Sequence, residues 1–308
     1  MKKKHISTII IALIFLAGLG FLLYPTVSNL WNRAHQSRAI ATYTKQVEKL
    51  DDSQNKEMLK AARKYNKSLL KKSDHWKLSK KDKKKYESLL DVSGTGIMGY
   101  IEVPKIDCSL PIYHGTDEGA LQIAIGHLEG SSLPVGGAST HAVISAHRGL
   151  PSASLFTDLD KLEEGDHFLI HVLNETLCYE VDKISVVKPE ETSGLAVEEG
   201  KDLVTLLTCT PYGVNTERLL VRGHRVEYVE QEVEAEKTLF SGISIHTNYL
   251  LWVIVGLLVT VAFIVVLYKK EQKLKKRRAE QATDEQEAPA VQDRTVTGDA
   301  DTETEKKE

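Results

Sequence analysis

The sequence predicts a mainly β domain, either a closed barrel or a sandwich, held outside the cell between two membrane spans. From Gly94 to Tyr228, short segments of β-forming residues alternate with Gly- and Pro-containing turns, and few long helical patterns interrupt them. Such a succession of short strands favours a closed or two-layered β architecture. Two uncharged apolar runs, 8–24 and 249–268, flank this region. The segment between the first run and Gly94 has the spacing of helices.

The apolar runs and the charges beside them predict the topology. A helix needs roughly 20 apolar residues to cross a bilayer, with about 17 as the lower limit. Lys2 to Lys4 precede the first run, and seven Lys or Arg residues between 269 and 278 follow the second. Positive flanks stay in the cytoplasm, so both termini are expected there, with the intervening chain extracellular. A cleaved signal peptide is the alternative for the first run, but the lack of a clear A-x-A site favours a retained anchor.

Composition divides the chain into segments. The net charge of −3 hides an acidic tail, because 279–308 carries ten Asp or Glu, three Lys or Arg and no aromatic residue. Such a composition is typical of disorder. The lysines lack the aromatic interleaving or motif of a nucleic-acid site, so no nucleic-acid partner is expected. The predicted segments are a cytoplasmic N-terminus (1–7), a transmembrane helix or uncleaved signal anchor (8–24), an extracytoplasmic helical extension (25–90), the β domain (91–230), a juxtamembrane linker (231–248), a second transmembrane helix (249–268) and a basic, then acidic, cytoplasmic tail (269–308).

Helices are predicted before the β region. Apolar residues recur at spacings of three and four from 40 to 50 and again from 58 to 69, which is the pattern of amphipathic helices. A break is expected near Asp51, with Asp52 or Ser53 capping the second helix. A charged loop follows, and then a short helix from Ser79 to Leu90 that begins with an S-x-x-D cap.

The strands are predicted from alternating apolar residues bounded by turn residues. We expect them at 96–103, 108–113, 141–146, 167–173, 177–187, 203–208 and 218–228. Short helices are expected at 117–125 and 154–162. Asn174 to Thr176 provide the hairpin turn between the fourth and fifth of these strands. The order of the strands does not by itself give their pairing.

Three cysteines lie in the predicted extracellular segment: Cys108, Cys178 and Cys209. An odd number outside the cell leaves at least one thiol free. No C-x-x-C pair is present, which argues against a cysteine-rich zinc site, and no metal or cofactor is implied. Cys108 and Cys178 lie in ordinary strand patterns, where buried packing is the expected role, and the sequence leaves a bond between them undecided.

Cys209 and two other residues could carry chemistry. Cys209 ends the strand TLLT and opens a loop with Pro and Gly, and His147 ends the strand HAVISA. Two strand ends can lie side by side in a barrel and bring a thiol nucleophile to an imidazole acid/base. Arg218 opens the strand after Cys209, so an antiparallel hairpin would return it to the thiol, where a guanidinium could hold an oxyanion. Buried packing for Cys209 and solvated roles for the other two are the alternatives.

These residues and their surroundings resemble the sortase family of transpeptidases. TLLTC followed by Arg218, with His147 upstream in SAHRGLP, matches the family pattern. The stretches LLDVSGTGIMGYIEVPKI, GHLEGSSLPVGG and TPYGVNTERLLVRGHR, the helical extension and the two anchors resemble the class C, pilin-polymerising branch. The resemblance implies an eight-stranded sortase-type β-barrel with an N-terminal helical extension and two transmembrane helices, on the outer face of a Gram-positive cell membrane.

The resemblance also implies a reaction. Cys209 would attack the Thr carbonyl of an LPxTG-like sorting signal on a pilin and release the Gly-containing tail. His147 would act as acid/base, and Arg218 would hold the oxyanion or the substrate. A pilin lysine amine would then resolve the thioacyl-enzyme and form an isopeptide bond. Whether Cys209 and His147 form an ion pair is not decided by the sequence.

Class C members often carry a lid with a D-P-(W/F) motif, and the corresponding place here reads Asp74-His75-Trp76. The resemblance implies that Asp74 meets Arg218 and that Trp76 packs near Cys209. Loss of the proline removes a fixed φ angle, so a looser lid is expected. An exposed charged loop is the alternative.

Other functions stay open at this point. A wall-anchoring sortase would use the same chemistry, although the lid and the two anchors disfavour it. A membrane-bound cysteine peptidase would pass the acyl group to water instead. An anchored, non-catalytic scaffold would leave the pattern of Cys209, His147 and Arg218 as coincidence.

Overall fold

The computed structural model describes residues 2–72, 74–228, 255–256, 260, 262, 265–266 and 268–281. The chain forms two compact units, 1–243 and 244–308, and the β domain belongs to the first. Of the predicted second membrane run, 249–268, only scattered helical residues are described, and the tail beyond 281 lies outside the described residues. In the second unit, 268–281 is helical and carries the predicted basic cluster.

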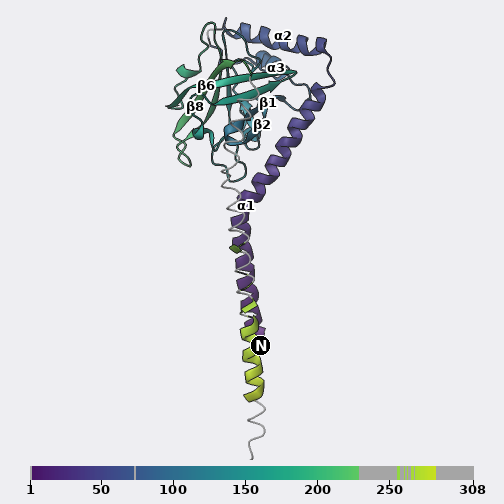
Figure 1. Ribbon diagram of the computed structural model, residues 1–308, viewed down its shortest axis with the longest axis vertical. Coiled ribbons are helices and arrows are strands. Elements are labelled where there is room, and N and C mark those ends of the chain that lie inside the picture. The colour runs from purple at the N-terminus through teal and green to yellow at the C-terminus, as the bar shows by residue number, and fades with distance from the viewer. Residues whose placement is uncertain are drawn as a thin grey trace, which may run out of the picture. The chain divides into compact units, whose positions relative to one another are not determined.

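Eight strands close into a barrel, which confirms the predicted architecture (Figure 1). Their order is β1-β2-β3-β4-β7-β8-β6-β5, and β5 pairs with β1 to close the sheet. The pairs β2–β3 and β4–β7 are parallel, and the other pairs are antiparallel. The strands are β1 (Ile97–Val103), β2 (Cys108–His114), β3 (Ile125–His127), β4 (Thr140–Ser145), β5 (His167–Val172), β6 (Glu175–Val187), β7 (Asp202–Thr210) and β8 (Glu217–Val226).

Two predictions in the β region need correction. Strand β3 was not expected, because three residues are too few to show an alternating pattern. The helix expected at 154–162 is only a 3-10 turn, η2 (Leu159–Lys161). The short helix expected at 117–125 is confirmed as α4 (Glu118–Leu121).

Alternation along the strands decides which side chains fill the barrel and which face outward. Val204, Leu206 and Thr208 of β7 are buried, and the first two belong to the main hydrophobic core. Because successive side chains of a strand point to opposite faces, Cys209 lies on the outer face of β7. The barrel therefore supports the thiol without enclosing it.

Helix α1 (Lys2–Val47) continues through Pro25, across the boundary expected between the first span and the extension. It is the one described helix long and apolar enough to cross a membrane, over Leu13–Val47. Its C-terminal part docks on the barrel. There, Tyr43 Oη donates to Met98 O at 3.1 Å and accepts from Leu173 N at 2.8 Å. Burial raises the pKa of Tyr43 to about 12, so the phenol stays neutral and keeps both bonds.

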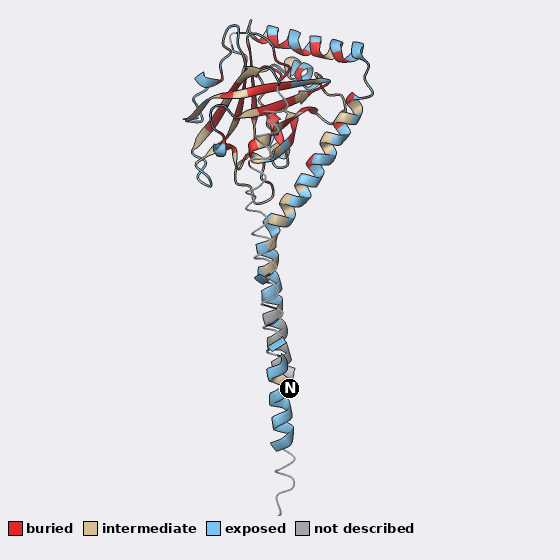
Figure 2. Cartoon of the chain, in the orientation of Figure 1, coloured by how far each residue is buried: buried red, intermediate tan, exposed pale blue. Residues whose placement is uncertain are grey.

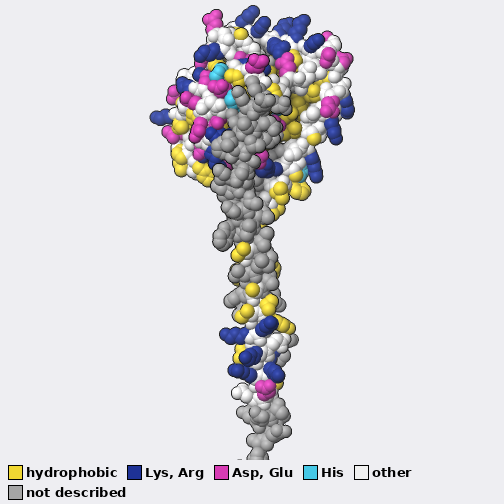
Figure 3. Space-filling view, in the orientation of Figure 1, with side chains coloured by type: hydrophobic (Ala, Val, Ile, Leu, Met, Phe, Trp, Pro, Cys, Tyr) yellow, Lys and Arg dark blue, Asp and Glu magenta, His cyan; other side chains and the backbone are white. Residues whose placement is uncertain are grey.

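Helix α2 (Asp52–Leu69) begins one residue earlier than expected. Its cap is Asp51, which forms a capping box with Gln54, and not Asp52 or Ser53. A capping box satisfies two free backbone N–H groups at once. The helix buries a face that includes Leu59, Ala62 and Tyr65 against the barrel (Figure 2). Lys and Arg side chains cover its other side (Figure 3).

Helix α3 (Lys80–Glu87) has the predicted cap, since Ser79 accepts from Asp82 N. Tyr86 fixes this helix to the barrel, because its hydroxyl accepts from Gly115 N and bonds His127 Nδ1, each at 2.9 Å. His127 Nε2 lies 2.7 Å from Ser132 O. The neutral imidazole carries its proton on Nε2 and donates it to this carbonyl, so Nδ1 accepts a hydrogen bond from the Tyr86 hydroxyl. Burial lowers the pKa of His127 to about 4. The segment between α2 and α3 is thus held at both ends.

Candidate active site

The hairpin β7–β8 places Arg218 directly opposite Cys209, as the sequence predicts. The two residues are antiparallel partners, followed by the pair of Thr210 with Glu217. Partners on one face of such a pair have Cβ atoms about 4.5–5.5 Å apart. Both side chains lie on the outer face and are partly exposed. A substrate carbonyl at the thiol therefore lies within reach of the guanidinium.

His147 follows β4, which runs parallel to β7 and pairs with it. Ser145 pairs with Leu207, so His147 and Cys209 each lie two residues beyond this pair. Two hydrogen bonds hold the strand ends together here. Ala146 N donates to Leu207 O at 3.1 Å, and Thr208 Oγ1 donates to Ala146 O at 2.8 Å. The structure thus brings all three predicted site residues to adjacent strand ends.

The other two cysteines are less suited to nucleophilic chemistry than Cys209. None of the three described cysteines forms a disulfide, so Cys108 and Cys178 are not bonded to each other. Cys178 is 1% exposed. Burial raises the pKa of Cys108 to about 12, which keeps this thiol neutral and unreactive. Cys209 is therefore the cysteine suited to nucleophilic chemistry.

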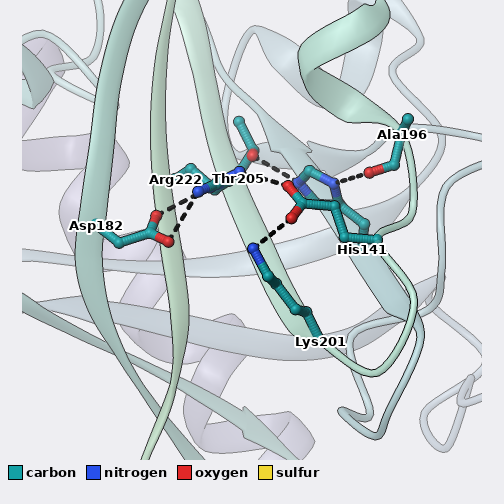
Figure 4. Close-up of polar contacts among 7 residues, drawn as sticks. His141, Asp182, Ala196, Lys201, Thr205 and Arg222 are labelled. Carbon is teal, nitrogen blue, oxygen red and sulfur yellow. Dashed lines mark hydrogen bonds and ion pairs between the residues drawn. The ribbon is translucent and has the colours of Figure 1, made fainter.

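The three arginines of β8 differ in their contacts, and this difference distinguishes Arg218 from Arg222 and Arg225. Arg222 is a side-chain bridge between Asp182, with contacts of 2.9 Å, and Glu198 at 2.7 Å (Figure 4). Arg225 lies over the ring of Tyr179. Arg218 donates only to backbone carbonyls of its own turn, those of Asn215 and Glu217. Its guanidinium has no carboxylate partner among the described residues, so it can turn to a substrate.

The network around Arg222 fixes the loop between β6 and β7 to the outer face of the sheet. His141 Nδ1 lies 2.8 Å from Ala196 O, and its Nε2 lies 2.7 Å from Thr205 Oγ1 (Figure 4). Donation by Nδ1 to the carbonyl and acceptance by Nε2 from the hydroxyl satisfy a neutral imidazole. Burial lowers the pKa of His141, which favours this neutral form. The loop between β6 and β7 is thereby tied to both β4 and β8.

A second apolar cluster lies next to the site on this outer face. Its buried members are Val143, Leu195 and Leu220. Leu207, two residues before Cys209, and Trp76 of the predicted lid pack against it. The structure therefore places Trp76 beside the strands that carry Cys209 and Arg218.

Asp74 does not have the partner that the resemblance implies. Its carboxylate lies 3.5 Å from Lys77 Nζ, and no ion pair with Arg218 is found among the described residues. The neighbouring His75 makes the contact with the barrel instead, because its Nδ1 lies 2.9 Å from Gly130 O.

The backbone of His75 and Trp76 packs very closely against Gly130. A Cβ atom added to it would lie 2.5 Å from His75 O and 3.0 Å from Trp76 Cα. Its φ of +92° also favours glycine. A cavity of about 230 Å³ borders the contact, with His75, Gly130 and His141 among its lining residues. Sequence reasoning noted His75 only as a missing proline and did not single out Gly130, since nothing local marks a glycine as a docking point.

Comparisons with known proteins agree with this geometry. A family profile described as "Sortase domain" matches residues 101–226. Sortase D from Bacillus subtilis (strain 168) is 31% identical over 131 residues, which are 42% of this chain and 63% of that protein. The chain thus spans less than two thirds of this relative's length. The crystal structure of sortase C1 from Streptococcus agalactiae is similar with a TM-score of 0.61 and 52% identity, over 62% of this chain and 100% of that one. Sortase C from Streptococcus pneumoniae, whose structure is described as informative on catalysis and pilin substrate specificity, gives a TM-score of 0.54 and 42% identity over 62% and 97%.

Proposed function

The chain belongs to the sortase family of cysteine transpeptidases, in its class C branch, and from this premise we propose that it polymerises pilins. The observation that carries the proposal is the alignment of three strand ends on one outer face. Cys209 and Arg218 are direct partners there, and the register of β4 with β7 brings in His147. A thiol, an imidazole and a fixed positive charge are what acyl transfer through a thioester requires.

The proposed reaction has two halves. With the thiol proton on His147, the Cys209 sulfur attacks the Thr carbonyl of an LPxTG-like sorting signal while Arg218 holds the developing oxyanion. The Thr–Gly bond breaks, His147 gives this proton to the amine that leaves, and the Thr acyl group stays on sulfur. A pilin lysine amine then attacks the thioester and loses a proton to His147, an isopeptide bond forms as the C–S bond breaks, and the proton remains shared by His147 and the released sulfur.

A pilin substrate is favoured by the neighbours and by the extension. The pneumococcal neighbour is described in terms of pilin substrate specificity. Helices α2 and α3 hold a segment against the outer face of the barrel, which a simple wall-anchoring or hydrolytic enzyme does not need. We place the barrel on the extracellular face of the membrane, with α1 as one anchor and 249–268 as the second.

Residues 74–78 form the proposed lid. Trp76 packs against the apolar cluster that contains Leu220, and in this proposal it competes with a bound peptide for this face. His75 fastens the segment to Gly130 by a side-chain hydrogen bond, in the place of the Asp74–Arg218 contact that the resemblance implies. In this proposal the lid is closed at rest and opens when a sorting signal competes for the same face.

The proposal is tested by expressing the pilin and the enzyme together and separating wall extracts by mass. Wild type is expected to give a ladder of covalent pilin multimers, and Cys209→Ala to give monomers only. Arg222→Lys is a matched control on the same hairpin and is expected to retain the ladder. Multimers formed normally by Cys209→Ala would refute the proposal. Monomers attached to wall peptide would identify a wall-anchoring enzyme instead.

A further inference from the structure

Arg148, the residue after His147, makes more contacts than a solvated strand-end arginine needs. Its side chain is only 8% exposed. Nε donates to Thr157 O at 3.1 Å, and Nη2 donates to Asp160 Oδ2 at 2.5 Å. Nη1 points in a third direction and donates to Thr210 Oγ1 at 3.3 Å. One guanidinium thus joins the loop after β4 to the end of β7.

These contacts complete a pattern around the proposed catalytic pair. Thr208, just before Cys209, is bonded to Ala146, just before His147. Thr210, just after Cys209, is bonded to Arg148, just after His147. Cys209 and His147 are therefore bracketed by one side-chain hydrogen bond on each side. Thr208 is fully buried, so its hydroxyl lies on the inner face of β7, opposite the Cys209 thiol.

The loop after Cys209 is tied to the same arginine. Arg148 Cζ lies 5.8 Å from the centroid of the Tyr212 ring. The ring also rests on Gly149, where an added Cβ would lie 2.9 Å from Tyr212 Cε2. The main chain of His147 is held as well, since its carbonyl accepts from Phe156 N at 3.3 Å. Arg148 is thus the centre of the contacts that fix both strand ends.

We propose that Arg148 is a positioning residue that holds His147 opposite Cys209 for proton transfer. The inference rests on the proposed sortase function. In this proposal Arg148 acts through the position of its neighbours. Asp160 neutralises its charge, so geometry and not electrostatics is its contribution. A planar guanidinium can serve three partners in fixed directions, which the single ammonium of lysine cannot do.

Arg148→Lys tests this, with cleavage of a fluorogenic LPxTG peptide by the purified full chain in detergent as the readout. Misplacing a catalytic group by about 1 Å can cost on the order of 100-fold in rate. We expect kcat to fall about 10- to 100-fold, with KM unchanged within about threefold and with the melting temperature retained. A purely structural role would lower the melting temperature and leave kcat per folded enzyme unchanged.

A matched pair at Thr210 keeps the test decisive if Arg148→Lys folds poorly. Thr210→Val removes only the hydroxyl and is expected to lower kcat about three- to tenfold, while Thr210→Ser retains the hydroxyl and activity near that of wild type. The double variant Arg148→Lys/Thr210→Val is expected to be no slower than Arg148→Lys within about twofold, because the two residues share one contact. A kcat within twofold of wild type in Thr210→Val, or losses that multiply in the double variant, would overturn the inference.

Wild type and Cys209→Ala are measured beside these variants to separate the two levels of the proposal. Cleavage that depends on Cys209 but is insensitive to Arg148 and Thr210 overturns only the positioning role. A wild type that shows no Cys209-dependent cleavage overturns the proposed function together with the inference that rests on it.

Discussion

Replacing His75 or Trp76 should raise the population of the open lid, and the contacts that each side chain makes give the size of the rise. His75→Ala removes one hydrogen bond to Gly130 O, worth about 1 kcal/mol net. Because about 1.4 kcal/mol is a factor of ten, the open population should rise about fivefold. Trp76→Ala removes the packing of a partly buried ring on the outer apolar cluster, worth about 2 kcal/mol. The corresponding rise is roughly 30-fold.

The assay is the rate at which a methanethiosulfonate reagent modifies Cys209, followed by mass spectrometry. Cys108 and Cys178 should not interfere, since the pKa of the first is raised to about 12 and the second is buried. His75→Gln is the matched control, because its amide can donate to the same carbonyl and should keep the wild-type rate.

Asp74→Ala is expected to change the labelling rate less than twofold. Its ion pair with Lys77 is solvent-exposed, and such pairs contribute about 0–1 kcal/mol. Because Asp74 pairs with Lys77 and Trp76 packs against the outer apolar cluster, we expect Trp76 and not Asp74 to control access to the thiol. A labelling rate that does not change in Trp76→Ala would refute the closed lid, and a large rise in Asp74→Ala would refute the partner assigned to it.

Three further predictions concern the barrel. The pKa of His127 is lowered from 6.5 to about 4 in the folded chain, so the unfolded chain binds more protons between these values. Stability should therefore be full above about pH 6.5 and should fall by about 2 kcal/mol between pH 7 and 5, a loss that calorimetry can follow and that His127→Gln should lessen. Thr208→Val should cost about 1–3 kcal/mol in denaturant unfolding, because Ala146 O loses its buried side-chain donor, while Thr208→Ser should cost less. Arg218→Ala should abolish peptide cleavage with little change in melting temperature, whereas Arg222→Ala should lower the melting temperature by several degrees; the reverse result would exchange the roles of these arginines.

Local patterns in the sequence were enough to predict most of the barrel. Alternation gave seven of the eight strands, and the hairpin argument placed Arg218 beside Cys209. Strand β3 has too few residues to show a period. The capping residue of α2 was misplaced by one position, because Asp51 and Asp52 are equally good caps by residue type and only the backbone decides between them.

Contacts between distant segments could not be predicted. Arg222 lies close to Arg218 in sequence, and only its bridge between Asp182 and Glu198 excludes it from the site. The hydrogen bond between His75 and Gly130 joins residues that are 55 positions apart in the sequence. Its geometry depends on how α2 and α3 dock on the barrel, which no local pattern encodes.

The most direct test of the account is the covalent product formed by the purified full chain. The chain is incubated with a pilin that carries a C-terminal LPxTG-like signal, and the product is digested and mapped by mass spectrometry. The account predicts that the Thr carbonyl of one pilin is joined to a lysine amine of another, through an intermediate on Cys209 that hydroxylamine releases. A product that ends in a free Thr carboxylate, or a linkage that forms equally well with Cys209→Ala, would contradict it.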